Sequence, residues 1–146
     1  MSSITFTVNS IDDIFIVAEK IFQLSSDNRI FLFYGEMGSG KTTLIKHIVA
    51  HFGIKEANSP TFSIINTYLG RKKQSIYHID CYRIENENEI ENIGLLEILY
   101  GENLCFIEWP EKIHNFLPNN YVRINIEIDN KLRKIIIETL VYLEMH

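Results

Sequence analysis

Apolar residues near the start of the chain recur at the spacing of an amphipathic helix. They are Ile14, Val17, Ala18 and Ile21. Ser10 and Asp13 stand at the beginning of this stretch like a capping box, with Asp in the position usually taken by Glu or Gln. We therefore predict a helix that begins after Ser10 and turns one face towards a core.

The next apolar run is short and continuous, and it is followed by a second helical period. Residues 29–34 have the length and composition of a buried strand. The helical period then runs through Leu44, Ile45, Ile48 and Phe52. Gly53 is a natural end for that helix, and the glycine-rich stretch "GEMGSGKTT" at 35–43 separates it from the strand. The pattern predicts a strand, a loop and a helix in direct succession.

Strand-like patterns dominate the middle of the chain. Residues 62–69 and 74–84 flank the sequence "GRKK", which predicts a β-hairpin. The basic run from Arg71 to Lys73 at its tip could contact nucleic acid. The simpler interpretation is a solvated tip whose charges discourage edge-to-edge pairing.

Residues 85–99 form an acidic amphipathic stretch, for which we predict one helix with Ile90, Ile93 and Leu96 facing inward. The segment "NLCFIEW" at 103–109 is typical of a buried strand that ends in a carboxylate.

The last apolar segments, 121–128 and 131–143, flank an Asp-Asn-Lys turn and predict a closing hairpin. Strands mixed with helices, and a glycine loop after an early strand, indicate a three-layer α/β sandwich of the P-loop NTPase type. The hairpins imply that its central sheet is mixed. Because the chain shows no repeat, low-complexity segment or linker, we predict a single P-loop domain over residues 1–146.

Composition narrows the class of protein. An apolar fraction of 46% and a charged fraction of 23% are those of an ordinary globular protein. A net charge of -5 disfavours broad electrostatic attachment to nucleic acid or anionic membranes. The apolar runs are shorter than the ~20 residues of a membrane helix and the first residues do not resemble a signal peptide, so we expect a cytoplasmic protein. Cys81 and Cys105 lie inside predicted strands without metal-type spacing, and we expect both to be buried apolar residues.

The loop at 35–43 carries the clearest chemical signal. From Gly35 to Thr42 it fits the Walker A pattern G-x-x-x-x-G-K-[ST]. Gly35 and Gly40, with Gly38 as an extra glycine, permit backbone conformations that let amide groups close on phosphates. The sequence therefore predicts a nucleotide-binding loop.

Each polar residue at the end of the loop has a predicted task. Lys41 would reach the β- and γ-phosphates, and the Thr42 hydroxyl would complete the shell of a Mg²⁺ ion. Thr43 is placed to contact the α-phosphate, and the helix N-terminus adds its partial positive charge.

Glu108 has the position of the acid that a metal-dependent site needs in addition to the Walker A loop. It follows four apolar residues in "LCFIEW", which is the shape of a Walker B strand. Glu108 could hold Mg²⁺ through water or polarise the attacking water, and both roles stay open. The alternative is an ordinary surface residue at a strand end, which the buried run before it disfavours.

A third group of polar residues lies in "YHIDCYRI". The two-residue period of a strand places His78, Asp80 and Tyr82 on one face. This face could be solvated. Alternatively, His78 and Asp80 could pair and enter the nucleotide site, with Asp80 near Mg²⁺.

Four motifs together resemble one family. They are "GEMGSGKTT", "SPTFSIINTY", "HIDCYR" and "IEWPE", in this order and over nearly the whole chain. This combination is similar to the TsaE (YjeE) family, small bacterial ATPases required for making threonylcarbamoyladenosine (t6A) in tRNA. Walker A is shared by many families, whereas the other three motifs are far more selective.

The resemblance implies roles for particular residues. The loop positions Gly38, Ser39, Gly40, Lys41, Thr42 and Thr43 would bind the phosphates of ATP. Glu108 would be the second metal-associated acid beside Thr42, and Asp80 would be needed for hydrolysis together with Lys41 and Glu108.

Three further positions would lie at the nucleotide. Ser59 to Phe62, including Thr61, would form a switch-like loop that senses the γ-phosphate. Trp109 matches a family position near the nucleotide. Arg133 corresponds to a basic residue close to it.

The resemblance also implies the biological role and the partners. The protein would be a Mg²⁺-dependent ATPase, weak on its own, that resets a complex of the threonylcarbamoyl transferase TsaD and its companion TsaB, so that tRNA is reached only through that complex. A small-molecule kinase is the alternative, but the chain leaves little room for both an acceptor pocket and a lid. A GTPase-like switch would need an Asn-Lys-x-Asp loop, and none is evident.

Overall fold

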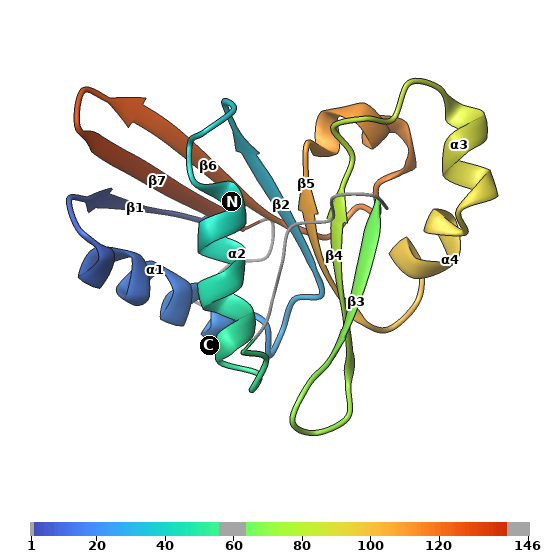
Figure 1. Ribbon diagram of the computed structural model, residues 1–146, viewed down its shortest axis with the longest axis horizontal. Helices are drawn as coiled ribbons and strands as arrows, with labels where there is room; N and C mark the ends of the chain where they lie inside the picture. Colours follow the sequence, from blue (N-terminus) through green and yellow to red (C-terminus); the bar gives the residue numbers. More distant parts are fainter. Residues whose placement is uncertain (1, 56–63, 140–146) are drawn as a thin grey trace.

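The computed structural model describes residues 2–55 and 64–139, and in this part of the chain the strands form one seven-stranded sheet (Figure 1). The order across the sheet is β1-β7-β6-β2-β5-β4-β3. The strands are β1 (Ser2–Val8), β2 (Ile30–Gly35), β3 (Ile65–Leu69), β4 (Ser75–Asp80), β5 (Leu104–Glu108), β6 (Val122–Asp129) and β7 (Leu132–Thr139).

Helices cover both faces of the sheet, which confirms the predicted three-layer α/β architecture. They are α1 (Ile11–Leu24), α2 (Lys41–Ala50), α3 (Glu87–Asn92), α4 (Leu95–Leu99) and the 3-10 segment η1 (Pro110–Phe116). Figure 1 shows α1 and α2 together below the half of the sheet that contains β1, β7 and β6, and α3 and α4 beside β4. Within the described ranges, no helix has the length and apolar character needed to cross a membrane.

The sheet is mixed, as predicted. Strands β4, β5, β2 and β6 are mutually parallel, whereas β3, β7 and β1 are joined to their neighbours by antiparallel pairing. Phe33 and Asp80 both lie opposite Glu108 in the register. Because parallel strands end at the same edge, the last residues of β2, β4 and β5 converge where ligands bind in open α/β sheets.

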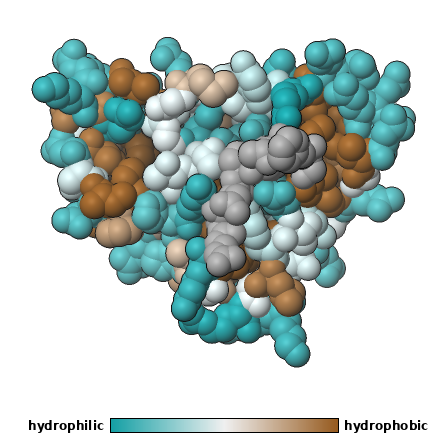
Figure 2. Space-filling model, viewed as in Figure 1, coloured by the Kyte–Doolittle hydropathy of each residue, from teal (hydrophilic) through white to brown (hydrophobic). Residues whose placement is uncertain are grey.

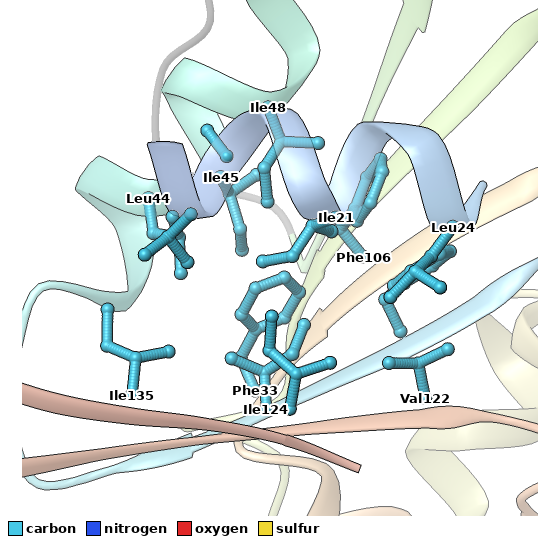
Figure 3. Packing of buried hydrophobic residues seen from close by; sticks show 14 of the residues in the cluster. Ile21, Leu24, Phe33, Leu44, Ile45, Ile48, Phe106, Val122, Ile124 and Ile135 are labelled. Carbon is cyan, nitrogen blue, oxygen red and sulfur yellow. The ribbon is translucent and has the colours of Figure 1, made fainter. Parts of the chain in front are cut away.

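The larger core lies between the sheet and the pair α1–α2 (Figure 3). Phe31 and Phe33 of β2 and Phe106 of β5 point towards these helices, with the rings of Phe31 and Phe106 5.3 Å apart. In Figure 3 Phe33 and Phe106 meet side chains from both helices, which are Ile21, Leu24, Leu44, Ile45 and Ile48. Each fully buried side chain of this size contributes about 1.5–3 kcal/mol relative to exposure. This packing fixes the start of α2 against the end of β2.

A second core fills the opposite face. Ile30 and Leu32, which alternate with Phe31 and Phe33 along β2, pack there with residues of α3, α4 and η1. Since β2 is covered on both faces, its sequence is apolar at every position from Ile30 to Phe33 instead of alternating.

The acidic stretch 85–99 departs from the prediction of one helix. It forms α3 and α4, which are separated at Gly94, where φ is +71°. Ile93, predicted to face inward, is 37% exposed, and Leu95 and Leu99 are buried in its place. The left-handed glycine turns the chain, so the helical period restarts after it.

The N-terminal region also differs from the sequence expectation in detail. Strand β1, which pairs with β7, was not among the predicted elements, although Ile4, Phe6 and Val8 alternate with polar residues. Helix α1 begins after Ser10 as predicted, but the Ser10 side chain caps nothing. Asp13 instead accepts a hydrogen bond from the Asn9 N–H at 2.8 Å, so the capping box is only half formed and shifted by one residue.

Both predicted hairpins are present. Strands β3 and β4 enclose the basic tip from Arg71 to Lys73, which is exposed and forms the hydrophilic end of the hairpin in Figure 2. Strands β6 and β7 enclose the Asp-Asn-Lys turn. The predicted strand residues 62, 63 and 140–143 lie outside the described part of the chain.

Both cysteines are buried and free, as expected. Cys105 lies in β5, and burial raises the pKa of its thiol to about 11. Cys81 follows β4 directly instead of lying within it, and burial also raises the pKa of this thiol. Neither group carries the reactivity of an exposed thiolate.

Candidate functional site

The loop between β2 and α2 has the backbone of a phosphate cradle. Gly38 and Gly40 adopt φ values of +79° and +107°, which L side chains rarely adopt. A Cβ added at Gly35 would lie 2.6 Å from Ser39 Oγ and 3.0 Å from the carbonyl oxygen of Ile126, so this glycine is required by close approach. The sequence of glycines therefore shapes the loop before any ligand is present.

Lys41 lies at the centre of the loop with its side chain directed back over it. Its Nζ donates to the carbonyl oxygen of Gly35 at 2.5 Å and lies 3.6 Å from the ring centroid of Trp109. Burial lowers the pKa of Lys41, and the negative charges of Glu108, Glu111 and Asp80 oppose this shift. The ammonium group is thus held among electron-rich groups that a phosphate could replace.

Glu108 and Thr42 meet beneath the loop. The Thr42 hydroxyl lies 2.9 Å from Glu108 Oε1 and 3.1 Å from Oε2. Glu108 is only 3% exposed, so the surface interpretation of this residue is wrong. Because β5 presents Phe106 to α2, the side chain two residues later points to the same face and reaches the first turn of that helix.

His78 and Asp80 behave differently from the two alternatives that the sequence left open. His78 has no exposed surface, so the solvated face does not include it. Its Nε2 lies 2.6 Å from Glu108 Oε2, and its partner is therefore Glu108 and not Asp80. The period of two correctly placed His78 and Asp80 on one face, but it could not show which strand lay beside them.

Asp80 is half-buried at the end of β4. Its Oδ1 accepts a hydrogen bond from the Tyr82 N–H at 3.0 Å. Burial raises the pKa of Asp80, the backbone hydrogen bond from Tyr82 lowers it, and the nearby Glu108 raises it further. Tyr82 itself is 47% exposed and lies beyond the strand.

One cleft gathers most of the predicted site residues. Its volume is ≈ 330 Å³, and its lining includes the loop together with Asp80, Glu108 and Trp109. The Tyr82 and Trp109 rings lie 5.0 Å apart at its rim. Trp109 has φ +55°, a left-handed conformation that directs the chain out of β5 and leaves the indole over Lys41. We call this cleft the metal flank of the loop.

A second cleft of ≈ 380 Å³ lies on the other side of the same loop. It shares four residues with the metal flank, which are Gly38, Ser39, Gly40 and Thr43. Its other walls come from the start of α1 and from β6 and β7, including Ile14, Lys131 and Arg133. Arg133 Nε donates to the carbonyl oxygen of Ser39 at 3.0 Å, so the predicted basic residue does lie against the loop. We call this cleft the nucleoside flank.

Thr61 and the rest of the predicted switch-like loop from Ser59 to Phe62 lie outside the described residues. The roles predicted for all site residues stay predictions. Among the described ones, all but Gly35 line the two flanks, and Gly35 contacts Lys41 through its carbonyl oxygen. Sequence reasoning missed Lys131 and the contact between His78 and Glu108. Lys131 belongs to no recognisable motif. His78 and Glu108 are 30 positions apart, and the sequence does not reveal that their strands are neighbours in the sheet.

The donor set beneath the loop suits one kind of metal site. Among the described residues, no group of three or more His, Cys, Asp or Glu side chains is arranged to hold an ion. The hydroxyl of Thr42 and the carboxylate of Glu108 offer a few hard oxygen ligands instead. This set fits Mg²⁺, which keeps several waters and is commonly bound through one or two protein groups plus substrate phosphates.

Comparisons with known proteins agree with the motifs. Residues 8–136 match the family model described as "Threonylcarbamoyl adenosine biosynthesis protein TsaE". The chain is 38% identical over 130 residues to the "tRNA threonylcarbamoyladenosine biosynthesis protein TsaE" of Rickettsia prowazekii, which covers 87% of this chain and 89% of the relative. It is 32% identical over 120 residues to the protein of the same name from Haemophilus influenzae, with 81% and 75% covered.

A solved structure supports the fold. The chain described as "Crystal structure of Bacillus subtilus YdiB" superposes with a TM-score of 0.74 at 24% identity, covering 96% of this chain and 87% of that one. The family model, over residues 8–136, spans the whole loop and the residues that line both flanks. From the loop, the acid beneath it and this match, we conclude that the chain belongs to the TsaE family.

Proposed function

We propose that this protein binds and hydrolyses ATP as a component of the machinery that makes threonylcarbamoyladenosine in tRNA. Its relatives carry the name of that pathway. The single observation that carries the ATPase part is the contact of Thr42 with Glu108 directly below a left-handed glycine loop. A Walker A hydroxyl that touches a buried acid at the end of the next parallel strand is the arrangement of a metal-assisted nucleotide site.

The phosphates would occupy the metal flank. Lys41 would exchange the Gly35 carbonyl and the Trp109 ring for β- and γ-phosphate oxygens, which are stronger partners for an ammonium. The N–H groups at the start of α2 would complete the cradle.

The nucleoside would extend into the nucleoside flank. Ile14 and Ile126 offer apolar surface there for a planar base, and Arg133 and Lys131 offer positive charge near the loop. The flank adjoins the phosphate cradle without a break, since four loop residues line both clefts. One nucleotide can therefore span the loop.

Thr42 and Glu108 would hold Mg²⁺, the first directly and the second directly or through water. The ion would neutralise charge on the phosphates when bound. Asp80, whose carboxylate lines the same cleft, would orient the attacking water. Lys41 would stabilise the charge that develops on the phosphate oxygens.

The partners follow from the family resemblance. We propose that ATP turnover resets a complex of TsaB and TsaD, and that tRNA meets this protein only through that complex. The net charge of -5 is compatible with such an indirect role, because an acidic surface repels the phosphate backbone. The cytoplasmic location remains a prediction.

A small-molecule kinase is not favoured. Between Leu44 and Phe106 the described chain contains the β3–β4 hairpin and the short helices α3 and α4, all of which pack on the sheet or continue it. None of these elements covers the metal flank as the lid of a kinase does.

The test is a comparison of ATP turnover with and without partners. Purified protein is incubated with ATP and Mg²⁺, alone and with TsaB and TsaD, and free phosphate is measured. We expect slow release alone and faster release with the pair. Negligible release in both cases would count against the proposal, and phosphate appearing on a metabolite would favour the kinase.

A further inference from the structure

We infer that His78 is a positioning residue that holds the Glu108 carboxylate on the metal flank, beside the Thr42 hydroxyl with which it would share the metal. This inference rests on the proposed nucleotide site, because it assigns a task to a residue within it. The contact that carries it is the 2.6 Å hydrogen bond between His78 Nε2 and Glu108 Oε2.

The strand register explains why the two side chains meet. His78 of β4 lies opposite Phe106 of the parallel strand β5. Phe106 and Glu108 are two residues apart, so they point to the same face, and His78 shares that face. The ring therefore reaches diagonally to the acid, with its own side chain fully buried and that of Glu108 nearly so. A contact made at this depth between two central strands has little freedom to move.

The direction of the hydrogen bond follows from chemistry. A carboxylate accepts hydrogen bonds, so we assign the proton of this contact to Nε2 of His78. Nδ1 is buried and finds no partner among the described residues. The neutral tautomer with the proton on Nε2 leaves a lone pair at Nδ1 and avoids an unpaired buried N–H, which would cost more. Glu108 is thus the one polar partner that the described residues give this ring.

Two donors lie beside the Glu108 carboxylate, the hydroxyl of Thr42 and the ring of His78. The hydroxyl lies within hydrogen-bonding distance of both carboxylate oxygens. A hydroxyl that binds a metal ion through an oxygen lone pair still carries its proton, so it can remain a donor to Glu108. His78 holds Oε2 from the side of β4 and thereby keeps the carboxylate beside Thr42.

Without His78, the carboxylate would have an alternative partner. Glu108 interacts electrostatically with Lys41, which must reach the phosphates. A Glu108 carboxylate that lost its contact with His78 of β4 would be drawn to the Lys41 ammonium and would neutralise its charge. By anchoring Oε2, His78 separates the acid of the metal site from the cation of the phosphate site.

The expected effect is specific to the metal. Loss of a residue that orients a metal-associated carboxylate typically costs about 10–100-fold in metal affinity or activity. Binding of nucleotide in the absence of Mg²⁺ depends on the loop and on the nucleoside flank, so it should stay within about twofold of wild type.

The experiment compares His78→Phe, which keeps a ring but removes the donor, with His78→Gln, whose side-chain amide can donate from nearly the same place. A fluorescent ATP analogue is titrated with Mg²⁺ and in EDTA, and the Mg²⁺ concentration for half-maximal binding and the kcat and KM for ATP are measured. Ile76→Val, a change at a fully buried residue of the same strand and face, is the matched control, and the Tm of each variant reports on folding.

We expect His78→Phe to raise the half-maximal Mg²⁺ concentration about 10–100-fold and to lower kcat more than it changes KM. His78→Gln should recover most of the loss, and Ile76→Val should leave the Mg²⁺ dependence unchanged. If His78→Phe does not fold, His78→Met replaces it, since it also lacks a donor.

Two results would overturn the inference. One is a donor-free variant with the wild-type Mg²⁺ dependence, and the other is a His78→Gln variant as impaired as the donor-free one. A wild-type protein whose nucleotide binding does not respond to Mg²⁺ would instead contradict the proposed function, so the two failures are distinct.

Discussion

The two flanks of the loop are built in opposite ways. On the metal flank, Glu108 and His78 are buried and joined by hydrogen bonds at the ends of parallel strands. On the nucleoside flank, Arg133 and Lys131 extend from the β6–β7 hairpin and are partly or fully exposed. The first flank is fixed by the covered part of the sheet, whereas the second is formed by long side chains at its margin.

This contrast suggests a division of labour. Chemistry at a phosphate requires charges held within a fraction of an ångström, which buried strands supply. Holding a nucleoside requires only apolar surface and a cation nearby, which a hairpin and a helix start can provide. Variants on the two flanks should therefore differ in kind: the metal flank should control turnover, and the nucleoside flank should control affinity.

Lys41→Ala should have the largest effect, because it removes the charge that would hold the phosphates on the metal flank. Truncating one partner of a charge pair in a desolvated site costs about 2–5 kcal/mol, so affinity for ATP should fall about 30-fold or more at 1.4 kcal/mol per tenfold. Isothermal titration with ATP measures this. Lys46→Ala, which removes an exposed charge from the same helix, is the control, and similar losses in both variants would contradict the role of Lys41.

Glu108→Ala should impair the function that we assign to the metal flank and spare that of the nucleoside flank. We expect turnover of ATP to fall about 10²–10³-fold because the site loses a preorganised charge, while nucleotide binding in EDTA is retained. Phosphate release and binding are measured on the same sample. Glu111→Ala removes an exposed carboxylate from the next segment of the chain and should retain turnover.

Asp80→Ala should act on turnover with a smaller effect. The loss of a group that orients water is expected to cost about 10²-fold in kcat, with ATP affinity unchanged. Asp27→Ala, an exposed acid in the turn between α1 and β2, is the control. Wild-type turnover in Asp80→Ala would show that its assigned role is wrong.

Arg133→Met tests the nucleoside flank and should lower affinity by a small amount. Its guanidinium is only partly buried, so the loss of its charge should cost about 0.2–1 kcal/mol, or less than about sixfold in affinity. The loss should be the same with Mg²⁺ and in EDTA, with kcat retained at saturating ATP. Lys134→Met makes the same change of charge at a neighbouring exposed position of β7. A loss of affinity seen only with Mg²⁺ would contradict the role of Arg133 in holding the nucleoside.

Local features of the fold could be predicted from the sequence, whereas neighbour relations could not. The loop, the strand of Glu108 and both hairpins follow from glycine spacing, apolar runs and turn residues, all of which act within a few positions. The order of strands is set by packing over long separations. For this reason neither alternative that the sequence left open for His78, a solvated face or a pair with Asp80 on its own strand, includes its actual partner, Glu108 on the next strand.

Two other differences have separate causes, one local and one distant in the sequence. Gly94 divides the predicted helix at 85–99 because its left-handed backbone interrupts the hydrogen-bond ladder, and a single glycine within a helical period does not reveal this in advance. Strand β1 carried a readable alternation in Ile4, Phe6 and Val8, but a single short strand gains its stability from β7, which lies more than 120 residues away in the sequence.

The pairing of β1 with β7 has a consequence for synthesis of the chain. Ser2 lies opposite Thr139, so β1 has no neighbour until more than 120 further residues have been synthesised. The central strand β2 likewise waits for β5 and β6. Nascent chains therefore keep apolar strands uncovered for most of translation, and we expect this protein to depend on chaperones more than its small size suggests.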